Sequence, residues 1–143
     1  MIVKKITNVE DLKNFCLKVN LHLPSELALI YCRSKIKFPS VIVYGIYEDD
    51  MLVSIMTVTF YYVFAHPDSP TGRIANISGA YTLPEYRHRG YASKLLQLII
   101  STSRAFNVDY LCCDSKADDL YYKQGFILSD DASRLWLPLK GDK

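Results

Sequence analysis

A long β-prone stretch at residues 40–64 constrains the fold more than any other feature of the chain. Its sequence is SVIVYGIYEDDMLVSIMTVTFYYVF, in which two runs rich in Val, Ile, Thr and Tyr flank Asp49 and Asp50. Strand-forming runs joined by a short polar turn are typical of a β-hairpin. We therefore expect two long antiparallel strands in the middle of the chain, with the other elements packed around them.

The segments on either side of this hairpin alternate between strand and helix patterns, and no linker or internal repeat divides them. This order indicates an α/β domain with a mixed sheet, and a single domain over residues 1–143. In chain order we expect a strand at 2–6, helices at 9–19 and 24–35, the hairpin, a strand at 73–83, a helix at about 90–106, a strand at 108–113, a short helix at 116–124 and a hairpin at 126–139.

The bulk composition argues against several classes of partner. The net charge of +2 over 143 residues is too small to attract a nucleic acid or an acidic membrane by bulk electrostatics. No run of about 18 uncharged apolar residues is present, and the amino terminus lacks the pattern of a leader peptide. We expect a cytoplasmic protein with no nucleic-acid and no membrane partner.

The four cysteines, at positions 16, 32, 112 and 113, show no CxxC spacing, and the last two lie together in an apolar run. Such positions indicate buried, reduced thiols. No set of Cys, His and acidic residues has the spacing of a metal site, and no nucleophile elbow is present. We expect no metal and no covalent enzyme intermediate.

The junction between the strand at 73–83 and the next helix, PEYRHRGYASKLL (84–96), contains an electrostatic conflict. Three basic residues, at 87–89, come just before the helix, whose amino end already carries a partial positive charge, so each cation there costs roughly 0.3 to 1 kcal/mol. A turn with Gly90 and Ala92 can direct unpaired backbone N–H groups toward one point, which favours an anion. The junction therefore predicts a local phosphate site.

The same stretch resembles the acyl-CoA signature of the GCN5-related N-acetyltransferases, with Arg87, Gly90 and Ala92 at the matching positions. A second landmark of that family appears about 30 residues later as ADDLYYKQGF, where Ala117, Leu120, Tyr121, Gly125 and Phe126 are in register. The two landmarks occur in the right order with a strand between them. The resemblance covers roughly residues 40–139.

This resemblance implies a fold and a co-substrate. We expect a mixed, mostly antiparallel twisted sheet of about seven strands flanked by about four helices, with the fourth and fifth strands splayed to admit acetyl-CoA. Gly79 would form the bulge that separates these strands, although a glycine needed only for packing is the alternative.

The resemblance also implies which residues hold the co-substrate. Arg87 or Arg89 would bind the pyrophosphate at the Gly90 turn, whereas His88, at the same turn, would point outward. Backbone groups at the end of the fourth strand would pair with the pantetheine arm, and Asp114 would accept hydrogen bonds from it, unless Asp114 only caps the next helix. The complete expected set is Ala80, Tyr81, Thr82, Arg87, His88, Arg89, Gly90, Tyr91, Ala92 and Asp114.

The expected reaction is direct attack of a primary amine on the thioester in a ternary complex. By the resemblance, Tyr121 would supply the proton to the departing thiolate, while Tyr122 would pack. Many relatives have a Glu on the fourth strand as a base, but this strand has Asn76 and Ser78. His66 has a suitable intrinsic pKa but lies in a surface loop.

The acceptor amine, of a small molecule or a peptide, is not specified by the sequence. Aromatic residues near the end of the third strand would either line its cleft or pack: Phe60, Tyr61, Tyr62 and Phe64. A CoA-binding module without turnover is the main alternative, because the strand-four carboxylate is missing. A nucleic-acid or protein-interaction domain without CoA is a weaker alternative, and the sequence leaves a homodimer open.

Overall fold

The hairpin of residues 40–64 forms the centre of the sheet. In the computed structural model, which describes residues 1–114 and 119–139, β2 (Ser40–Glu48) and β3 (Met51–Tyr62) pair antiparallel around a turn at Asp49 and Asp50. Both turn residues have positive φ angles, of 47° and 65°, and short polar side chains tolerate this conformation better than most. The predicted hairpin is confirmed.

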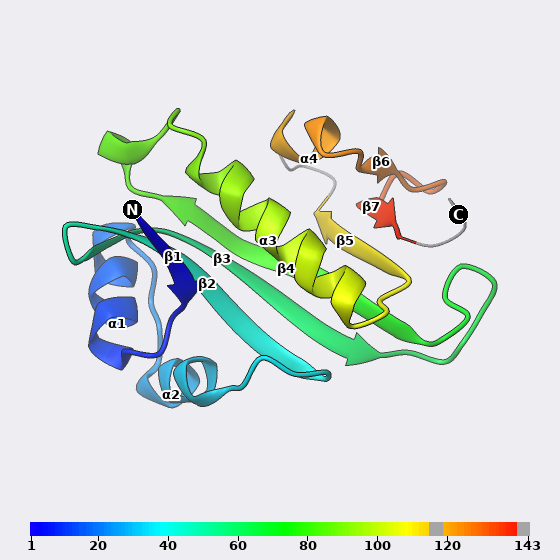
Figure 1. Ribbon diagram of the computed structural model, residues 1–143, viewed down its shortest axis with the longest axis horizontal. Coiled ribbons are helices and arrows are strands. Elements are labelled where there is room, and N and C mark those ends of the chain that lie inside the picture. The colour runs from blue at the N-terminus through cyan, green and yellow to red at the C-terminus, as the bar shows by residue number, and fades with distance from the viewer. Residues whose placement is uncertain (115–118, 140–143) are drawn as a thin grey trace.

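Seven strands form one mixed sheet in the described part of the chain, in the order β1-β2-β3-β4-β5-β7-β6 (Figure 1). The β4–β5 pair is parallel, and the other pairs are antiparallel. The closing hairpin places β7 beside β5 and leaves β6 at the edge. The additional strands are β1 (Ile2–Lys5), β4 (Arg73–Thr82), β5 (Tyr110–Asp114), β6 (Ile127–Leu128) and β7 (Arg134–Pro138).

The helices cover opposite faces of the sheet. They are α1 (Val9–Lys18), α2 (Ser25–Arg33), α3 (Tyr91–Ala105) and α4 (Asp119–Lys123), with a short 3₁₀ helix, η1 (Pro84–Tyr86). On β2, the hydroxyls of Tyr44 and Thr102 on α3 lie 3.3 Å apart, whereas Tyr47 donates a hydrogen bond to Asp11 on α1 at 2.8 Å. Because Tyr44 and Tyr47 point to opposite faces of one strand, α3 and α1 lie on opposite sides.

The helices form where the sequence patterns place them. Asn8 caps α1 by accepting a hydrogen bond from the Asp11 N–H at 3.0 Å, and α3 buries Leu95, Leu96 and Ile99 completely against the sheet. Ala92, expected on the same face, is only half-buried. The helix expected at 116–124 is observed from Asp119, and its first residues lie outside the described part of the chain.

The loop between β3 and β4 is fixed by a buried carboxylate that the sequence did not reveal. One oxygen of Asp109, Oδ2, accepts hydrogen bonds from Ser69 Oγ at 2.7 Å, Thr71 N at 3.0 Å and Thr71 Oγ1 at 2.7 Å. Asp109 is 2% exposed and precedes β5. The loop is therefore held against the start of β5, close to the point where β4 and β5 begin to pair.

Side-chain burial confirms some expectations about single residues and overturns another. All four cysteines are buried and free. Tyr122, expected to pack, is 47% exposed, because it lies on the outer side of α4 while Tyr121 faces inward. Of the aromatic residues near the end of β3, Phe60 is buried and Phe64 is almost fully exposed. No helix in the described ranges is both long and apolar enough to cross a membrane.

Candidate active site

Strands β4 and β5 separate halfway along the sheet. Their parallel register runs from Ile74 opposite Tyr110 to Asn76 opposite Cys112, while β4 continues to Thr82 and β5 to Asp114. Within the described residues, the β5 side of β4 therefore has no strand partner beyond Asn76. The resulting fork presents backbone N–H and C=O groups of Ile77–Thr82 that an extended ligand could pair with.

Gly79 lies at a bulge next to this fork. Ser78 is in register with Thr57, and Tyr81 with Ile55, so Gly79 and Ala80 face the single residue between Thr57 and Ile55. The φ angle of Gly79 is +58°, and a Cβ atom there would lie 3.1 Å from Thr57 Oγ1. Where two residues of one strand lie opposite a single residue of its partner, the strand bends and the direction of its edge changes, as at other β-bulges. The expected bulge is present.

The turn from β4 into α3 ends at a left-handed glycine. Gly90 is the N-cap of α3 with φ +82°, and a Cβ atom built there would meet nothing within 4 Å. The first intrahelical bond runs from Lys94 N to Gly90 O at 3.1 Å, so the preceding N–H groups of the first turn have no helical acceptor. No side chain of the described residues caps this end. The turn therefore offers N–H donors beside open space, which suits a phosphate.

The three basic residues before Gly90 point in different directions. The Arg87 side chain lines the groove and donates from Nε to Thr82 O at 3.2 Å. Arg89 instead donates from Nη2 to Glu85 O at 2.9 Å and lies 4.9 Å from the Tyr86 ring, outside the groove. His88, expected to point outward, lines the groove with a φ angle of +63°. The structure thus places Arg87 and His88, but not Arg89, at the candidate phosphate site.

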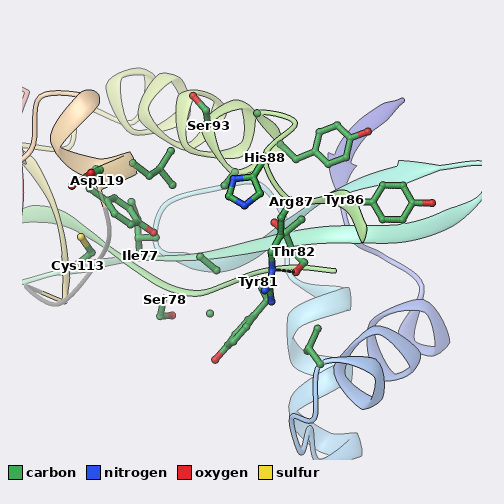
Figure 2. Close-up of a pocket in the computed structure, with 18 of the residues that line it drawn as sticks. Ile77, Ser78, Tyr81, Thr82, Tyr86, Arg87, His88, Ser93, Cys113 and Asp119 are labelled. Carbon is green, nitrogen blue, oxygen red and sulfur yellow. Dashed lines mark hydrogen bonds between the residues drawn. The ribbon is translucent and has the colours of Figure 1, made fainter. Parts of the chain in front are cut away.

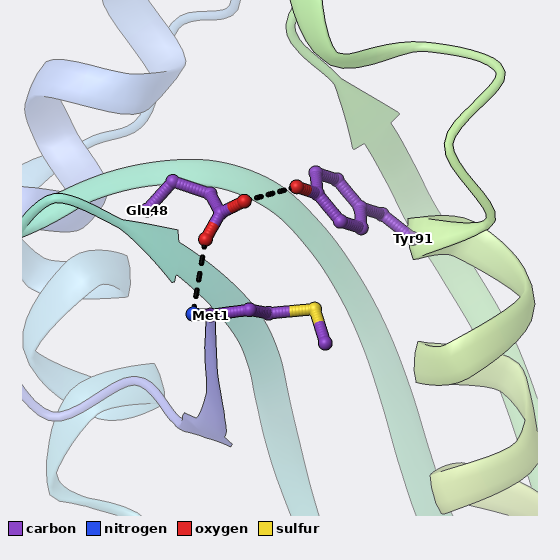
Figure 3. Close-up of polar contacts among 3 residues, drawn as sticks. All are labelled: Met1, Glu48 and Tyr91. Atoms are coloured by element: carbon purple, nitrogen blue, oxygen red, sulfur yellow. Dashed lines mark hydrogen bonds and ion pairs between the residues drawn. The ribbon is translucent and has the colours of Figure 1, made fainter.

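Tyr91 is the first residue of α3 and connects this helix to the turn of the β2–β3 hairpin. Its hydroxyl donates a hydrogen bond to Glu48 Oε2, and the other oxygen of Glu48 lies 3.1 Å from the amino group of Met1 (Figure 3). The hydrogen bond to Glu48 raises the pKa of Tyr91, and the same bond, followed by the Met1 amine, lowers the pKa of Glu48. The Tyr91 hydroxyl is thereby occupied, which leaves its backbone N–H and ring for the groove.

An open groove of about 1420 Å³ connects the fork, the Gly90 turn and α4 (Figure 2). In this view Ser78 and Tyr81 point away from α3, whereas His88 and Ser93 lie on its side. The groove is therefore reached from both faces of the sheet. Every residue expected to hold the co-substrate lines it except Arg89: Ala80, Tyr81, Thr82, Arg87, His88, Gly90, Tyr91, Ala92 and Asp114.

Tyr121, the expected proton donor, lies on α4 and lines the same groove. Its side chain is 6% exposed, and its ring packs edge-on against Phe126 with the centroids 5.4 Å apart. Cys113, at the end of β5, also lines the groove, and burial, more than any neighbouring charge, raises the pKa of its thiol to about 12. Ala117, a member of the second landmark, lies outside the described residues.

Asn76 and Ser78 provide no base, and the structure shows how Asn76 is used instead. Its Oδ1 accepts a hydrogen bond of 2.6 Å from Arg134 Nη2 on β7, and the Cys112 thiol lies 3.5 Å from the same oxygen. His66 contacts the Tyr110 ring with the centroids 6.5 Å apart, and its backbone pairs with Ser69. None of the described groove residues is a glutamate.

Several groove residues were not found from the sequence. The end of α1 and the two residues after it contribute Lys18, Val19 and Asn20 to the groove lining. Gln124 on the α4 side donates a hydrogen bond to Ser93 Oγ on α3 at 3.2 Å. These contacts join segments about 30 to 60 residues apart, so no local pattern could have indicated them. In the described part of the chain, no group of three or more His, Cys, Asp or Glu could hold a metal ion.

The fork, the bulge and the helix start lie together in one α/β fold. A family model described as the Acetyltransferase (GNAT) family matches residues 8–126. The chain belongs to this family of acetyltransferases, as the two landmarks indicated. No curated protein matches the sequence.

Solved structures of acetyltransferases share the fold at low sequence identity. Arabidopsis thaliana NAA60 in complex with acetyl-CoA is similar with a TM-score of 0.74 at 12% identity, over 98% of this chain and 99% of that one. The GNAT domain of S. lividans PAT gives 0.73 at 13%, over 96% and 89%. A predicted acetyltransferase with acetyl-CoA from Clostridium acetobutylicum gives 0.63 at 19%, over 92% and 86%. At these identities the likeness shows the fold.

Proposed function

We propose that this protein is an acetyl-CoA-dependent N-acetyltransferase that acetylates a primary amine of a small molecule or a peptide by direct attack in a ternary complex. The observation that carries this proposal is one groove that contains three parts: the unpaired edge of β4, the N–H donors at the Gly90 turn, and Tyr121. An elongated ligand with a phosphate group at one end and a thioester at the other would need all three parts. Membership of the acetyltransferase family supports acetyl-CoA as that ligand.

The co-substrate would be held by complementary groups along the groove. The pyrophosphate would accept hydrogen bonds from the first N–H groups of α3, with Arg87 and His88 beside it. The pantetheine arm would pair with the backbone of Ala80 and Tyr81. The carbonyl of Thr82 already accepts a hydrogen bond from Arg87, so we expect its part in binding to be smaller.

The proposed transfer needs no covalent enzyme intermediate. The amine nitrogen attacks the thioester carbonyl carbon, a C–N bond forms and the C–S bond breaks, and the electron pair of that bond stays on sulfur. Tyr121 donates its phenolic proton to the thiolate, and the positively charged nitrogen of the tetrahedral adduct loses a proton to leave a neutral amide. Solvent then returns a proton to the Tyr121 phenolate. Tyr121 is the candidate because it is the tyrosine of α4 that faces the groove, whereas Tyr122 faces outward.

Deprotonation of the amine is assigned to water. An alkylamine has a pKa near 10.4 in solution, so its proton must leave before attack. Asn76 cannot take that proton and is bound to Arg134, and Ser78 is not a base at neutral pH. We expect the rate to rise with pH as the free amine becomes more abundant.

Thiol release tests the proposal directly. Purified protein is incubated with acetyl-CoA and a panel of primary amines, free CoA is measured with a thiol reagent, and the acetylated amine is identified by mass spectrometry. Stoichiometric CoA and acetylamine support the proposal. An acetylated side chain trapped on the protein would contradict direct transfer.

The alternative, a CoA-binding module without turnover, is favoured by the absence of a glutamate from the described groove residues. It predicts that acetyl-CoA raises the unfolding midpoint, because a ligand that binds the native state stabilises it by mass action. It also predicts that no amine in the panel releases CoA. The two readouts together separate the alternatives.

A further inference from the structure

The sheet has an open face beside the fork, on the side opposite α3. The register places Asn76, Cys112 and Trp136 side by side across β4, β5 and β7, so they share one face. The residues next to them along each strand, such as Ile77 and Leu111, point to the opposite face and pack in the core with α3. Helices α1 and α2 pack on β3 and β2 respectively, so no helix of the described residues covers this face over β4, β5 and β7. Asn76 and Trp136 on this face are half-buried.

Arg134 crosses this open face. It is in register with Asp114 on β5, whereas Asn76 is in register with Cys112, two residues away along that strand. The hydrogen bond from Arg134 Nη2 to Asn76 Oδ1 therefore carries the side chain diagonally over Cys112, which is 3% exposed. Burial raises the pKa of the Cys112 thiol, and the charge of Arg134 opposes that rise.

The guanidinium retains most of its hydrogen-bonding capacity. It has five N–H donors, of which one is used on Asn76, and Arg134 forms no ion pair within the described residues. The side chain is exposed, with Asp114 as its acidic neighbour across the strands. The hydrogen bond to Asn76 holds the guanidinium in one orientation. A guanidinium that is already held loses less conformational freedom when it binds a planar anion such as a carboxylate.

Aromatic side chains share this face of the sheet with Arg134. Tyr110 and Trp136 pack edge-on with their centroids 5.3 Å apart. The register places Tyr61 and Tyr110 on either side of Ile74, on the same face of the sheet as Cys112 and Trp136. Apolar surface with one oriented cation is suited to a ligand that has an apolar body and one anionic group.

The position of Arg134 relates this surface to the reaction. Asn76 and Cys112 form the last register pair before β4 and β5 part, so the guanidinium lies at the base of the fork. On the α3 side, core residues such as Leu95 and Leu96 pack against the sheet next to the groove. An amine that approaches a thioester in the fork from the open face therefore passes Arg134.

We propose, resting on the proposed acetyltransferase function, that the acceptor is an amine that also carries a carboxylate and an apolar side chain. Arg134 binds the carboxylate, Asn76 orients Arg134, and Tyr61, Tyr110 and Trp136 pack against the apolar part. Both a free apolar amino acid and a short peptide with an apolar carboxyl-terminal residue have this chemistry. Polycationic amines are disfavoured by the same guanidinium.

Matched acceptor pairs test this inference. Phenylalanine, tyrosine, leucine and methionine are each compared with the corresponding amino-acid amide, and glycyl-phenylalanine with its carboxamide, which separates the free amino acid from the peptide. Values of kcat/KM are expressed per concentration of unprotonated amine, because an amide lowers the pKa of the neighbouring amine. We expect at least one carboxylate to exceed its amide by tenfold or more.

The variant Arg134→Gln provides the second test. It retains a side chain that can bond to Asn76 but removes the charge, so KM for the carboxylate acceptor should rise at least tenfold. The rate with the matching amide and the Kd for acetyl-CoA should stay within about twofold. Arg104→Gln, at an exposed position on α3, is the matched control and should leave every value unchanged.

Equilibrium binding keeps the inference independent of turnover. Calorimetry measures the same acceptors against protein saturated with CoA, and the carboxylate should bind more tightly to the wild type than to Arg134→Gln. Equal binding of every carboxylate and its amide would overturn the inference even when amines are acetylated. Preferential carboxylate binding without CoA release would uphold it and count against the proposed enzyme activity.

Discussion

Gly90 is the residue on which the phosphate site depends most. A φ angle of +82° costs an L-residue roughly 1–2 kcal/mol, and the open space beside its Cα is where a phosphate would lie. We expect Gly90→Val to weaken CoA binding at least tenfold, about 1.4 kcal/mol, in a protein that still folds. Isothermal calorimetry measures the affinity, and circular dichroism checks the fold.

The control for Gly90 is Gly125→Ala, which introduces similar backbone strain at φ +99° after α4. It should lower the unfolding midpoint as much as a change at Gly90 does, with a smaller effect on CoA affinity. Unchanged CoA affinity in a folded Gly90→Val protein would falsify the assignment of this turn.

Tyr121 is the residue on which proton donation depends. Tyr121→Phe keeps the ring that packs against Phe126 and removes only the hydroxyl, so CoA and amine binding should change little. We expect kcat to fall by about 10²-fold to 10⁴-fold if protonation of the thiolate limits the rate. The high-pH limb of the kcat profile should also shift, because it reports loss of the acid.

Tyr122→Phe is the matched control for Tyr121, because its side chain is exposed on the next position of α4. It should turn over at the wild-type rate with the same pH profile. The opposite pattern, a slow Tyr122→Phe and a normal Tyr121→Phe, would show that Tyr122 and not Tyr121 is the proton donor.

Cys113 should make the stability of the protein depend on alkaline pH. Burial raises its pKa from 9.0 to about 12, so the folded state holds this proton more tightly than the unfolded state does. Its favourable contribution to the unfolding free energy is complete below about pH 9 and is lost as the pH rises toward about 12. Urea unfolding of the wild type and Cys113→Ala should show a steeper decline for the wild type in that interval.

At the residue scale, local patterns predicted a phosphate site at the Gly90 turn but not which of the neighbouring side chains line the groove. The strand–helix junction, with its glycine and basic residues, indicated an anion site at Gly90. Arg87, His88 and Arg89 lie in an irregular turn with no repeating period, and the positive φ of His88 redirects the chain there. The direction of each side chain therefore depends on contacts with Thr82, Glu85 and Tyr86.

At the scale of the elements, the loop between β3 and β4 should depend on Asp109. Asp109→Ala would leave the buried Ser69 hydroxyl without this acceptor and would release the Thr71 donors. A buried polar group without a partner costs about 1–3 kcal/mol. We expect the unfolding free energy to fall by at least about 2 kcal/mol. Chemical denaturation measures the loss, and faster proteolysis within residues 65–72 would locate it.

Asp68→Ala is the matched control for Asp109, since this exposed aspartate lies in the same loop. It should leave the unfolding free energy within about 0.5 kcal/mol of the wild type. Equal losses from both substitutions would show that the loop responds to any change and that Asp109 has no special part in holding it.

The elements themselves were largely predictable, because hydrophobic period and turn composition are local properties. The β2–β3 hairpin and α3 were found within one or two residues of their observed ends. The role of Asp109 was not found, because its partners lie 38 to 40 residues earlier in the chain. The fork was expected only through the family resemblance, since no pattern within β4 or β5 states where their pairing stops.

At the scale of the whole molecule, acetyl-CoA should join the two parts of the sheet. The β4–β5 pairing spans only Ile74–Asn76 and Tyr110–Cys112, whereas β3 and β4 pair along most of their length. A pantetheine arm between the strands would provide acceptors for backbone N–H groups of Ile77–Thr82. We expect hydrogen exchange in this segment, and in β7, to slow when saturating CoA is added.

The α1 segment provides the control for that exchange measurement, because Val9–Phe15 precedes the groove-lining end of the helix. Its exchange rates should change little with CoA. Equal slowing throughout the chain would indicate general stabilisation by mass action. It would count against the prediction that CoA joins the two parts of the sheet at the fork.

The arrangement of the whole sheet was predicted through the family resemblance more than through physical patterns. Alternation within strands fixes which face is buried but not which strand lies beside which. Placing β7 between β5 and β6 requires the closing hairpin to fold back onto β5, and the register from Tyr110 opposite Pro138 to Asp114 opposite Arg134 emerges only in the folded chain. For that reason, the sequence did not indicate that Arg134 lies beside Asn76 on this face of the sheet.

The fork also has a consequence for the protein before it binds any ligand. An unpaired strand edge is a template onto which another extended chain can add, and proteins usually protect such edges. Here the edge from Ile77 to Thr82 lies inside the sheet and has no strand partner in the described part of the chain. Under the proposed function, bound acetyl-CoA would cover this edge and protect it from pairing with another chain, and we expect the protein to aggregate more readily when CoA is absent.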